Sequence, residues 1–172
     1  MSLPFSVWVD ADSCPVDVRQ IIIRFAKRLE LKTYFVANHP IPSPKSELFE
    51  MIIADTTPDA ADNIIVERIK PDDIAITRDI PLASRLVEKQ ITVINDRGTL
   101  FTAENIREKL SIRDFNKTLY ENGLISEKNS AFGKKEANLF ANCFDREIQK
   151  KLRGNLNIRQ RQGADVYTSL KP

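Results

Sequence analysis

Apolar and polar positions along the first hundred residues predict strands and helices in alternation. Short apolar runs, typical of buried strands, occur at residues 5–9, 33–37, 48–54, 74–77 and 91–94. Apolar residues at helical spacing lie between them, at residues 18–29, 61–69 and 81–88. This alternation predicts an α/β fold whose central sheet is mostly parallel and has helices on both faces.

From residue 102 onward the apolar spacing is only helical. It predicts one helix that ends near Gly123, and a later amphipathic helix over residues 137–148 that packs on the body. Beyond Gly154 the sequence is polar and without a pattern. We therefore expect one domain over residues 1–152, including the C-terminal helices, and a polar, basic and poorly ordered tail over residues 153–172.

Composition narrows the class of protein. Of the 172 residues 42% are hydrophobic, which is enough for one core, and no apolar run approaches the ~18 residues of a membrane span. The N-terminus lacks a secretory pattern, and the two cysteines are 129 positions apart. These features predict a protein of the reducing cytoplasm that has no membrane partner.

The charge is unevenly distributed along the chain. Residues 150–172 carry six basic side chains and one acid, so the net charge of +2 divides into +5 there and −3 over residues 1–149. This division is compatible with an acidic cation site and a polyanionic partner, and equally with a solvated basic tail.

The aspartates gather where predicted strands end or helices begin. They are Asp10, Asp12, Asp59, Asp62, Asp79 and Asp96. Parallel strands bring their carboxyl ends to one edge of the sheet, so several of these groups are expected to meet there. Carboxylates ~4 Å apart repel by about 1 kcal/mol even in water, unless a cation lies between them. Mg²⁺ or Mn²⁺, which prefer oxygen ligands, are the cofactors that such a cluster predicts.

Each acid also has a simpler structural explanation. Asp12, Asp59, Asp62 and Asp79 suit helix N-termini, and Asp12 or Ser13 can cap the first helix. Asp10 is harder to explain in this way, because an acid that ends a buried strand needs a partner. Three further acids are expected to be solvated: Asp17, Asp72 and Asp73.

Other residues limit the chemistry further. Cys14 lies in a helix first turn, but no base is near it in the sequence, which argues against a catalytic thiol. His39 is the only histidine, which excludes a histidine-based triad and a multi-histidine metal site. Asn38 ends the second strand, where its side chain either points into the same edge or starts a turn.

Several short motifs resemble, in order, those of the YaiI/YqxD family of uncharacterised bacterial proteins. They are VDADSCPV (9–16), VAN (36–38), DAADN (59–63), ITRDIPLA (76–83), RG (97–98), NI (105–106) and RDF (113–115). The resemblance covers about residues 5–152. It implies a PIN-like domain, the fold of many metal-dependent nucleases.

In that wider group, acids at three such places hold one or two Mg²⁺ or Mn²⁺ ions. The resemblance assigns these places to Asp10, Asp62 and Asp79, with Asp12 and Asp59 as neighbours. Asp96 stands where the family pattern has proline, so the resemblance gives it no metal-binding role.

The leading hypothesis is a Mg²⁺- or Mn²⁺-dependent nuclease that acts on RNA or structured nucleic acid. Asp10, Asp62 and Asp79 would hold the ions, and Asp12 would be a further ligand or orient a water. Asp59 and Asn38 would support the site. The basic residues that would neutralise neighbouring phosphates are Arg78, Arg97, Arg113, Lys134 and Lys135.

Two alternatives remain open. A haloacid-dehalogenase-type phosphatase would use Asp10 as its nucleophile, because Asp10 and Asp12 follow one strand and Thr77 another. The other alternative is a non-catalytic PIN-like module that binds a cation or nucleic acid.

Overall fold

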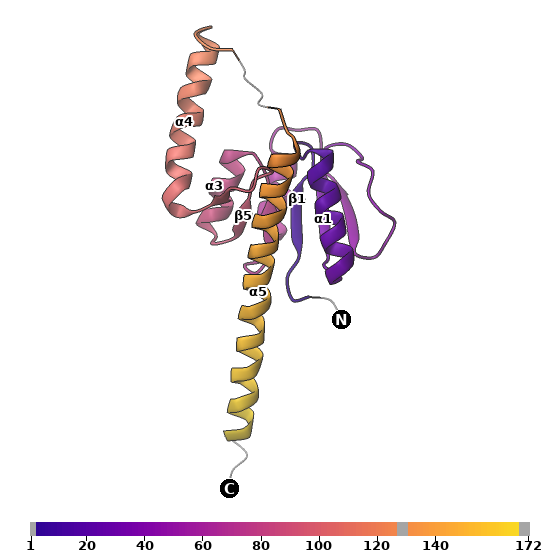
Figure 1. Cartoon of the computed structure of the whole chain (residues 1–172). Helices are drawn as coiled ribbons and strands as arrows, with labels where there is room; N and C mark the ends of the chain where they lie inside the picture. The colour runs from indigo at the N-terminus through magenta and orange to yellow at the C-terminus, as the bar shows by residue number, and fades with distance from the viewer. Residues whose placement is uncertain (1–2, 127–130, 169–172) are drawn as a thin grey trace.

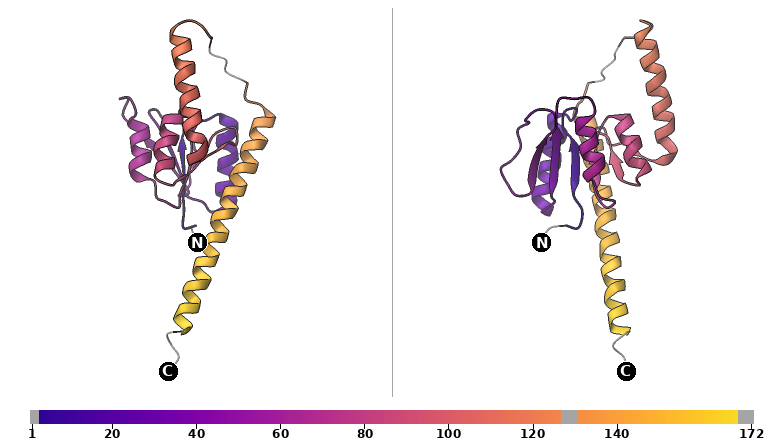
Figure 2. Two further views of the ribbon diagram at one scale, coloured as in Figure 1. Left: turned by 90° about the vertical axis from the view of Figure 1, so that its left-hand side faces the viewer. Right: turned by 180° about the vertical axis from the view of Figure 1, so that it is seen from behind.

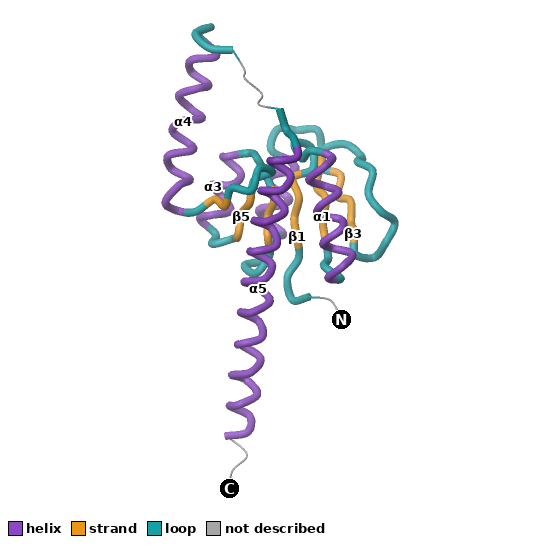
Figure 3. The backbone as a smooth tube through the Cα atoms, viewed as in Figure 1, coloured by secondary structure: helices purple, strands orange, loops and turns teal. Residues whose placement is uncertain are grey.

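The architecture is an α/β sandwich built on one six-stranded sheet (Figures 1 and 3). A computed structural model describes residues 3–126 and 131–168. The strand order is β3-β2-β1-β4-β5-β6, in which the first five strands are parallel and β6 pairs antiparallel with β5. The strands are β1 (Val7–Asp10), β2 (Thr33–Ala37), β3 (Phe49–Ile53), β4 (Ile74–Ile76), β5 (Thr92–Ile94) and β6 (Leu100–Phe101). The predicted α/β fold with a mostly parallel sheet is therefore confirmed.

Helices cover both faces of the sheet (Figure 2). They are α1 (Val16–Leu29), α2 (Ala60–Arg68), α3 (Ile80–Glu88), α4 (Ala103–Glu121) and α5 (Lys134–Thr168). Helices α1 and α5 share one core cluster with the sheet, while α2, α3 and the start of α4 share the other. The pleat of β1 divides its side chains accordingly, since Val7 and Val9 belong to the first cluster and Trp8 to the second.

Helix α5 packs on the body through its first half, as the apolar spacing predicts. Phe140, Phe144 and Ile148 are fully buried there. The turn between β5 and β6 lies against this helix at Gly98, which has φ +80°, and a Cβ at this position would overlap the backbone of Leu139. Glycine is therefore required here for two reasons, which are the positive φ of the backbone and the close approach of α5.

Three local features differ from the sequence prediction. The short strand β6 was not predicted, because two residues are too few to show a period. Neither Asp12 nor Ser13 caps α1, whose N-cap residue is Pro15 and has no side-chain hydrogen bond. Helix α5 spans Lys134–Thr168, so it continues past residue 148, where the predicted helix ends, and through most of the predicted tail; residues 169–172 of that tail lie outside the described residues.

The two long helices extend beyond the sheet in opposite directions (Figures 1 and 2). Helix α4 buries only Ile106 fully, near its start, and its second half leaves the body. Within residues 3–126 and 131–168, no helix has both the length and the apolar character needed to cross a membrane.

Candidate functional site

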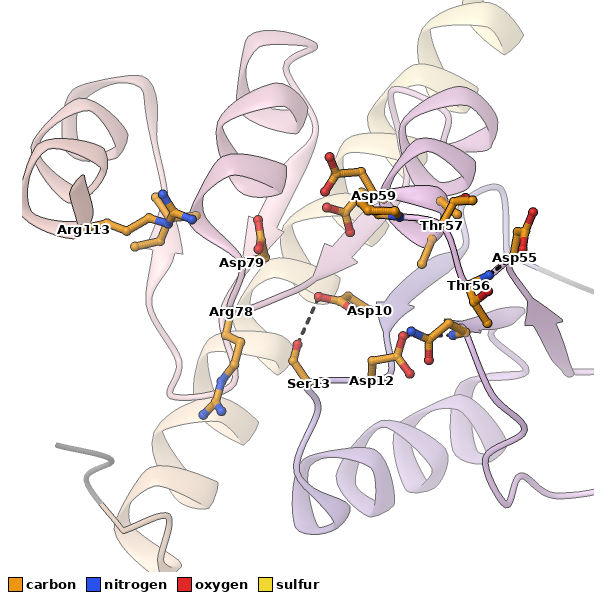
Figure 4. A pocket seen from close by; sticks show the side chains of 16 residues that line it. Asp10, Asp12, Ser13, Asp55, Thr56, Thr57, Asp59, Arg78, Asp79 and Arg113 are labelled. Carbon is orange, nitrogen blue, oxygen red and sulfur yellow. Dashed lines mark hydrogen bonds between the residues drawn. The ribbon is translucent and has the colours of Figure 1, made fainter. Parts of the chain in front are cut away.

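A cavity of about 590 Å³ opens at the carboxyl ends of β1 and β4 (Figure 4). The strand order changes direction between these two strands, and open α/β sheets bind ligands at such a switch point. The cavity is lined by Asp10, Asp12, Ser13, Asn38, residues 55–62, Arg78, Asp79, Ile80 and Arg113. The structure thus brings together at one edge five of the six aspartates that the sequence singled out.

Asp10 is the most buried of these acids, with 6% of its surface exposed. Its Oδ2 accepts hydrogen bonds from Ser13 Oγ at 3.0 Å and from Thr77 Oγ1 at 2.8 Å. The Thr77 hydroxyl in turn accepts a hydrogen bond from the Asp79 backbone N–H at 3.0 Å. One buried hydroxyl therefore connects the end of β1 to the segment that follows β4.

Burial raises the pKa of the Asp10 carboxyl, although the hydrogen bonds from Thr77 and Ser13 lower it. The negative charges of Asp79 and Asp12 raise it further. The net result is a carboxylate that is fixed in orientation and less acidic than usual.

Asp79 is the N-cap of α3, where its Oδ1 accepts a hydrogen bond from the Leu82 N–H at 2.7 Å. The capping explanation is thus confirmed for Asp79, and the same residue also lines the cavity. Capping uses only one carboxylate oxygen, so it leaves the other free to serve a second purpose.

Asp62 lies half-buried in the first turn of α2. Its pKa rises to about 6, mainly because of burial and then because of the charges of Asp79, Asp10 and Asp59. This is the effect expected where carboxylates share a site without a cation between them. Asp59 stands at the N-cap position of α2 with φ 60°, and makes no side-chain capping bond.

Asp12 binds the loop after β2. Its Oδ2 accepts a hydrogen bond from the Asn38 N–H at 2.9 Å, and its Oδ1 lies 3.0 Å from His39 Nδ1. Asn38 therefore contacts Asp12 through its backbone, while its own Oδ1 lies 3.0 Å from the same His39 nitrogen. These contacts hold the ends of β1 and β2 together at the rim of the cavity.

The predicted basic residues have different positions. Arg113 and Arg78 line the cavity, and Figure 4 shows Arg113 reaching from α4 toward Asp79. Arg78 also forms an ion pair of 2.7 Å with Asp96, which is 3% exposed and does not line the cavity. Arg97 is likewise outside the cavity lining, with Nη1 3.9 Å from Glu136 Oε1. The two lysines at the start of α5, Lys134 and Lys135, do not line it either.

The Cys14 thiol is poorly suited to nucleophilic chemistry. Burial raises its pKa to about 12, with smaller opposing effects from Arg19 and Asp96. The thiol is therefore protonated at neutral pH, which agrees with the sequence argument against a catalytic cysteine.

The loop over residues 55–58 is a part of the lining that the sequence reasoning missed. Asp55 is the second residue after β3, and its Oδ1 accepts a hydrogen bond from the Thr56 N–H at 2.7 Å. The rule that strands of a parallel sheet end at one edge applies to β3 as well, so it would have found this residue.

The acids surround one cavity without forming a coordination shell. Among the residues that the structure describes, no three His, Cys, Asp or Glu side chains are grouped so that they could hold a metal ion. The chemistry of the donor set nevertheless suits a hard cation, because these are oxygen ligands and two of them, Asp10 and Asp62, have raised pKa values that a bound cation would lower.

Comparisons with known proteins agree with the resemblance seen in the sequence motifs. A family model described as uncharacterized BCR, YaiI/YqxD family, matches residues 8–150. A UPF0178 protein of Treponema denticola is 50% identical over 147 residues, which are 86% of this chain and 94% of the relative. A UPF0178 protein of Syntrophobacter fumaroxidans is 46% identical over 151 residues, 87% of this chain and 99% of the relative. No solved structure matches the chain, so the PIN-like assignment stays a prediction.

Proposed function

Since the chain belongs to the YaiI/YqxD family, whose description names no activity, we propose a function from its own residues. It is a Mg²⁺- or Mn²⁺-dependent nuclease that hydrolyses phosphodiester bonds of RNA or structured nucleic acid in the β1–β4 cavity. The observation that carries the proposal is that Asp10, Asp62 and Asp79, from three separate elements, line one cavity in which the Asp62 pKa is raised to about 6.

Electrostatics supports a cation at this place. Mutual repulsion and burial both disfavour the charged forms of Asp10 and Asp62, and a divalent ion would replace the repulsion by attraction and offset the cost of burial. Asp10, Asp62 and Asp79 would hold the ion, and Asp12 would be a further ligand or orient a water. A bound Mg²⁺ or Mn²⁺ would lower the pKa of an attacking water and stabilise the charge that develops on the phosphate oxygens.

Other side chains in and beside the cavity would orient the acids and position the substrate. The Thr77 hydroxyl, through its hydrogen bond to Oδ2, fixes the orientation of the Asp10 carboxylate. The guanidinium of Arg113 reaches toward Asp79 and would neutralise a phosphate at the cavity mouth (Figure 4). Arg78 would act similarly from the other side, with its orientation set by the ion pair with Asp96.

The test is cleavage of end-labelled RNA by the purified chain with Mg²⁺ or Mn²⁺, and with EDTA as the metal-free reference. Asp10→Asn and Asp79→Asn should each reduce the rate by more than about 100-fold. That factor is the largest loss typical of residues that only hydrogen-bond to a metal ligand, and a ligand itself should matter more. Asp17→Asn is the matched control, because Asp17 is an exposed acid in the first turn of α1.

Three outcomes would reject the proposal. Metal-dependent cleavage that survives both substitutions would show that the cavity is not the site. A covalent phosphoryl group trapped on Asp10 would identify a phosphatase instead. Tight, salt-sensitive RNA binding without turnover would identify a non-catalytic module.

A further inference from the structure

A second cavity, of about 720 Å³, follows the outer half of α4 and meets the first one at Arg113. We name it the α4 groove. It is lined by Arg113, Asn116, Lys117, Tyr120, Leu124, Ile125 and Ser126. Because Arg113 lines both cavities, the α4 groove adjoins the acidic site at this residue.

The spacing of the lining residues explains the groove. Arg113, Lys117 and Tyr120 are separated by four and three positions, so they lie on one face of α4. This part of the helix leaves the body (Figures 1 and 2), so its side chains are not used in the core. Tyr120, Leu124 and Ile125 are 51%, 71% and 41% exposed, although all three are largely apolar.

The charged side chains of the α4 groove are opposite in sign to the aspartates of the neighbouring acidic site. Among the residues that the structure describes, the lining of the groove includes two cations and no carboxylate, whereas the first cavity is lined by Asp10, Asp62 and Asp79. Arg113 is 3.0 Å from Asp114, and Lys117 is 3.9 Å from Glu121, but these pairs are exposed. Such surface pairs contribute little, so both cations remain available to a polyanion.

We propose that the α4 groove binds a single-stranded polynucleotide and directs it past Arg113 into the acidic cavity. Arg113 and Lys117 would contact consecutive phosphates, and a base would stack on Tyr120 against Leu124 and Ile125. Only an unpaired base exposes its face to such a platform, so the groove selects single strands over duplexes. This inference rests on the proposed function, and it specifies the substrate class of that site.

The test measures binding apart from cleavage. A fluorescein-labelled oligouridylate of about 12 nucleotides is titrated with the full chain in EDTA, and anisotropy gives the Kd. Tyr120→Ala should raise the Kd about tenfold. Phe115→Ala is the matched control, because Phe115 is an aromatic residue of the same helix that is 63% exposed and lies outside the groove. The control should leave the Kd unchanged.

The dependence on salt tests the phosphate contact. Lys117→Gln should reduce the slope of log K against log salt by about 0.7. Arg107→Gln, an exposed cation of α4 outside the groove, should leave the slope unchanged. Equal effects of Tyr120→Ala and Phe115→Ala, or a duplex that binds as tightly as the single strand, would overturn the inference.

Two further results separate the possible failures. Self-association that Tyr120→Ala abolishes, while the Kd for the oligonucleotide stays the same, would assign the groove to a second copy of the chain and overturn the inference. A chain that binds the strand through Tyr120 but never cleaves it would refute the nuclease and retain the binding groove.

Discussion

Replacing Asp62 by Asn should stabilise the metal-free protein, although it removes a residue of the proposed site. The Asp62 pKa rises from its ordinary value of 3.8 to about 6, which corresponds to about 3 kcal/mol of unfavourable free energy for the ionised form. Because the carboxylate is only half-buried, solvent screening reduces this to about 1 kcal/mol. Asn keeps the shape and removes the charge, so it should recover that amount at pH 7.

The sign of the effect follows from the order in which the two states ionise. As the pH rises through 4 the unfolded chain loses the Asp62 proton first, so folding becomes less favourable until the folded group ionises near pH 6. The advantage of Asp62→Asn is therefore absent near pH 3.5, grows between about pH 4 and 6, and is constant above. Urea unfolding in EDTA at pH 3.5, 5 and 7 measures it directly.

A bound metal ion should make the original chain more stable than Asp62→Asn. With Mn²⁺ at about 100 times its Kd, the original chain should gain about 2.7 kcal/mol and Asp62→Asn much less. Asp17→Asn is again the control, because Asp17 is also in a helix first turn; its loss should destabilise by a few tenths of a kcal/mol through the helix dipole. If Asp62→Asn is less stable than the original chain in EDTA at pH 7, the electrostatic reasoning is wrong.

Two other substitutions test the fold around the site. Gly98→Ala should destabilise the protein by about 3 kcal/mol, because a Cβ there overlaps the Leu139 backbone, whereas Gly123→Ala, at φ +68° in open space, should cost only about 1 kcal/mol. Thermal unfolding of both variants measures the two losses of stability. Equal losses would contradict the close approach of Leu139 to Gly98. Asp73→Ala should lower the free energy of unfolding, measured with urea, by about 3 kcal/mol, since the buried carboxylate accepts hydrogen bonds from Ser6 N–H, Trp8 Nε1 and Lys70 N–H. A loss below about 1 kcal/mol would show that water satisfies these donors in the variant.

The sheet and the edge that carries the site could be predicted because their signals are local. Residues 33–37 form a strand with the predicted bounds, and Asp79 caps α3 as its place before Pro81 suggested. The position of each acid after a strand or before a helix, combined with parallel topology, was then sufficient to bring Asp10, Asp62 and Asp79 to one cavity.

The environment of an acid could not be predicted where its hydrogen-bond or ion-pair partner is distant along the chain. Asp73 was expected to be solvated, but it is 3% exposed, because Ser6 and Trp8 reach it from β1 and the segment before it. Asp12 was offered as a helix cap, but it binds the loop after β2 instead. Asp96 also follows a strand, but that strand, β5, lies one position beyond the switch point between β1 and β4. Asp96 therefore pairs with Arg78 and does not line the cavity.

The acidic cavity can be completed only after β4 has been synthesised, because Thr77, which follows β4, orients Asp10. Asp10 and Thr77 are 67 positions apart, and their hydrogen bond forms only when β4 has been added beside β1. A nascent chain that ends before β4 has Asp10, Asp12 and Asp62 but not Thr77 and Asp79, which orient and complete the group. Nearly half of the chain must therefore be synthesised before the group is complete, so a product truncated before β4 should carry Asp10, Asp12 and Asp62 without the residues that orient and complete the group.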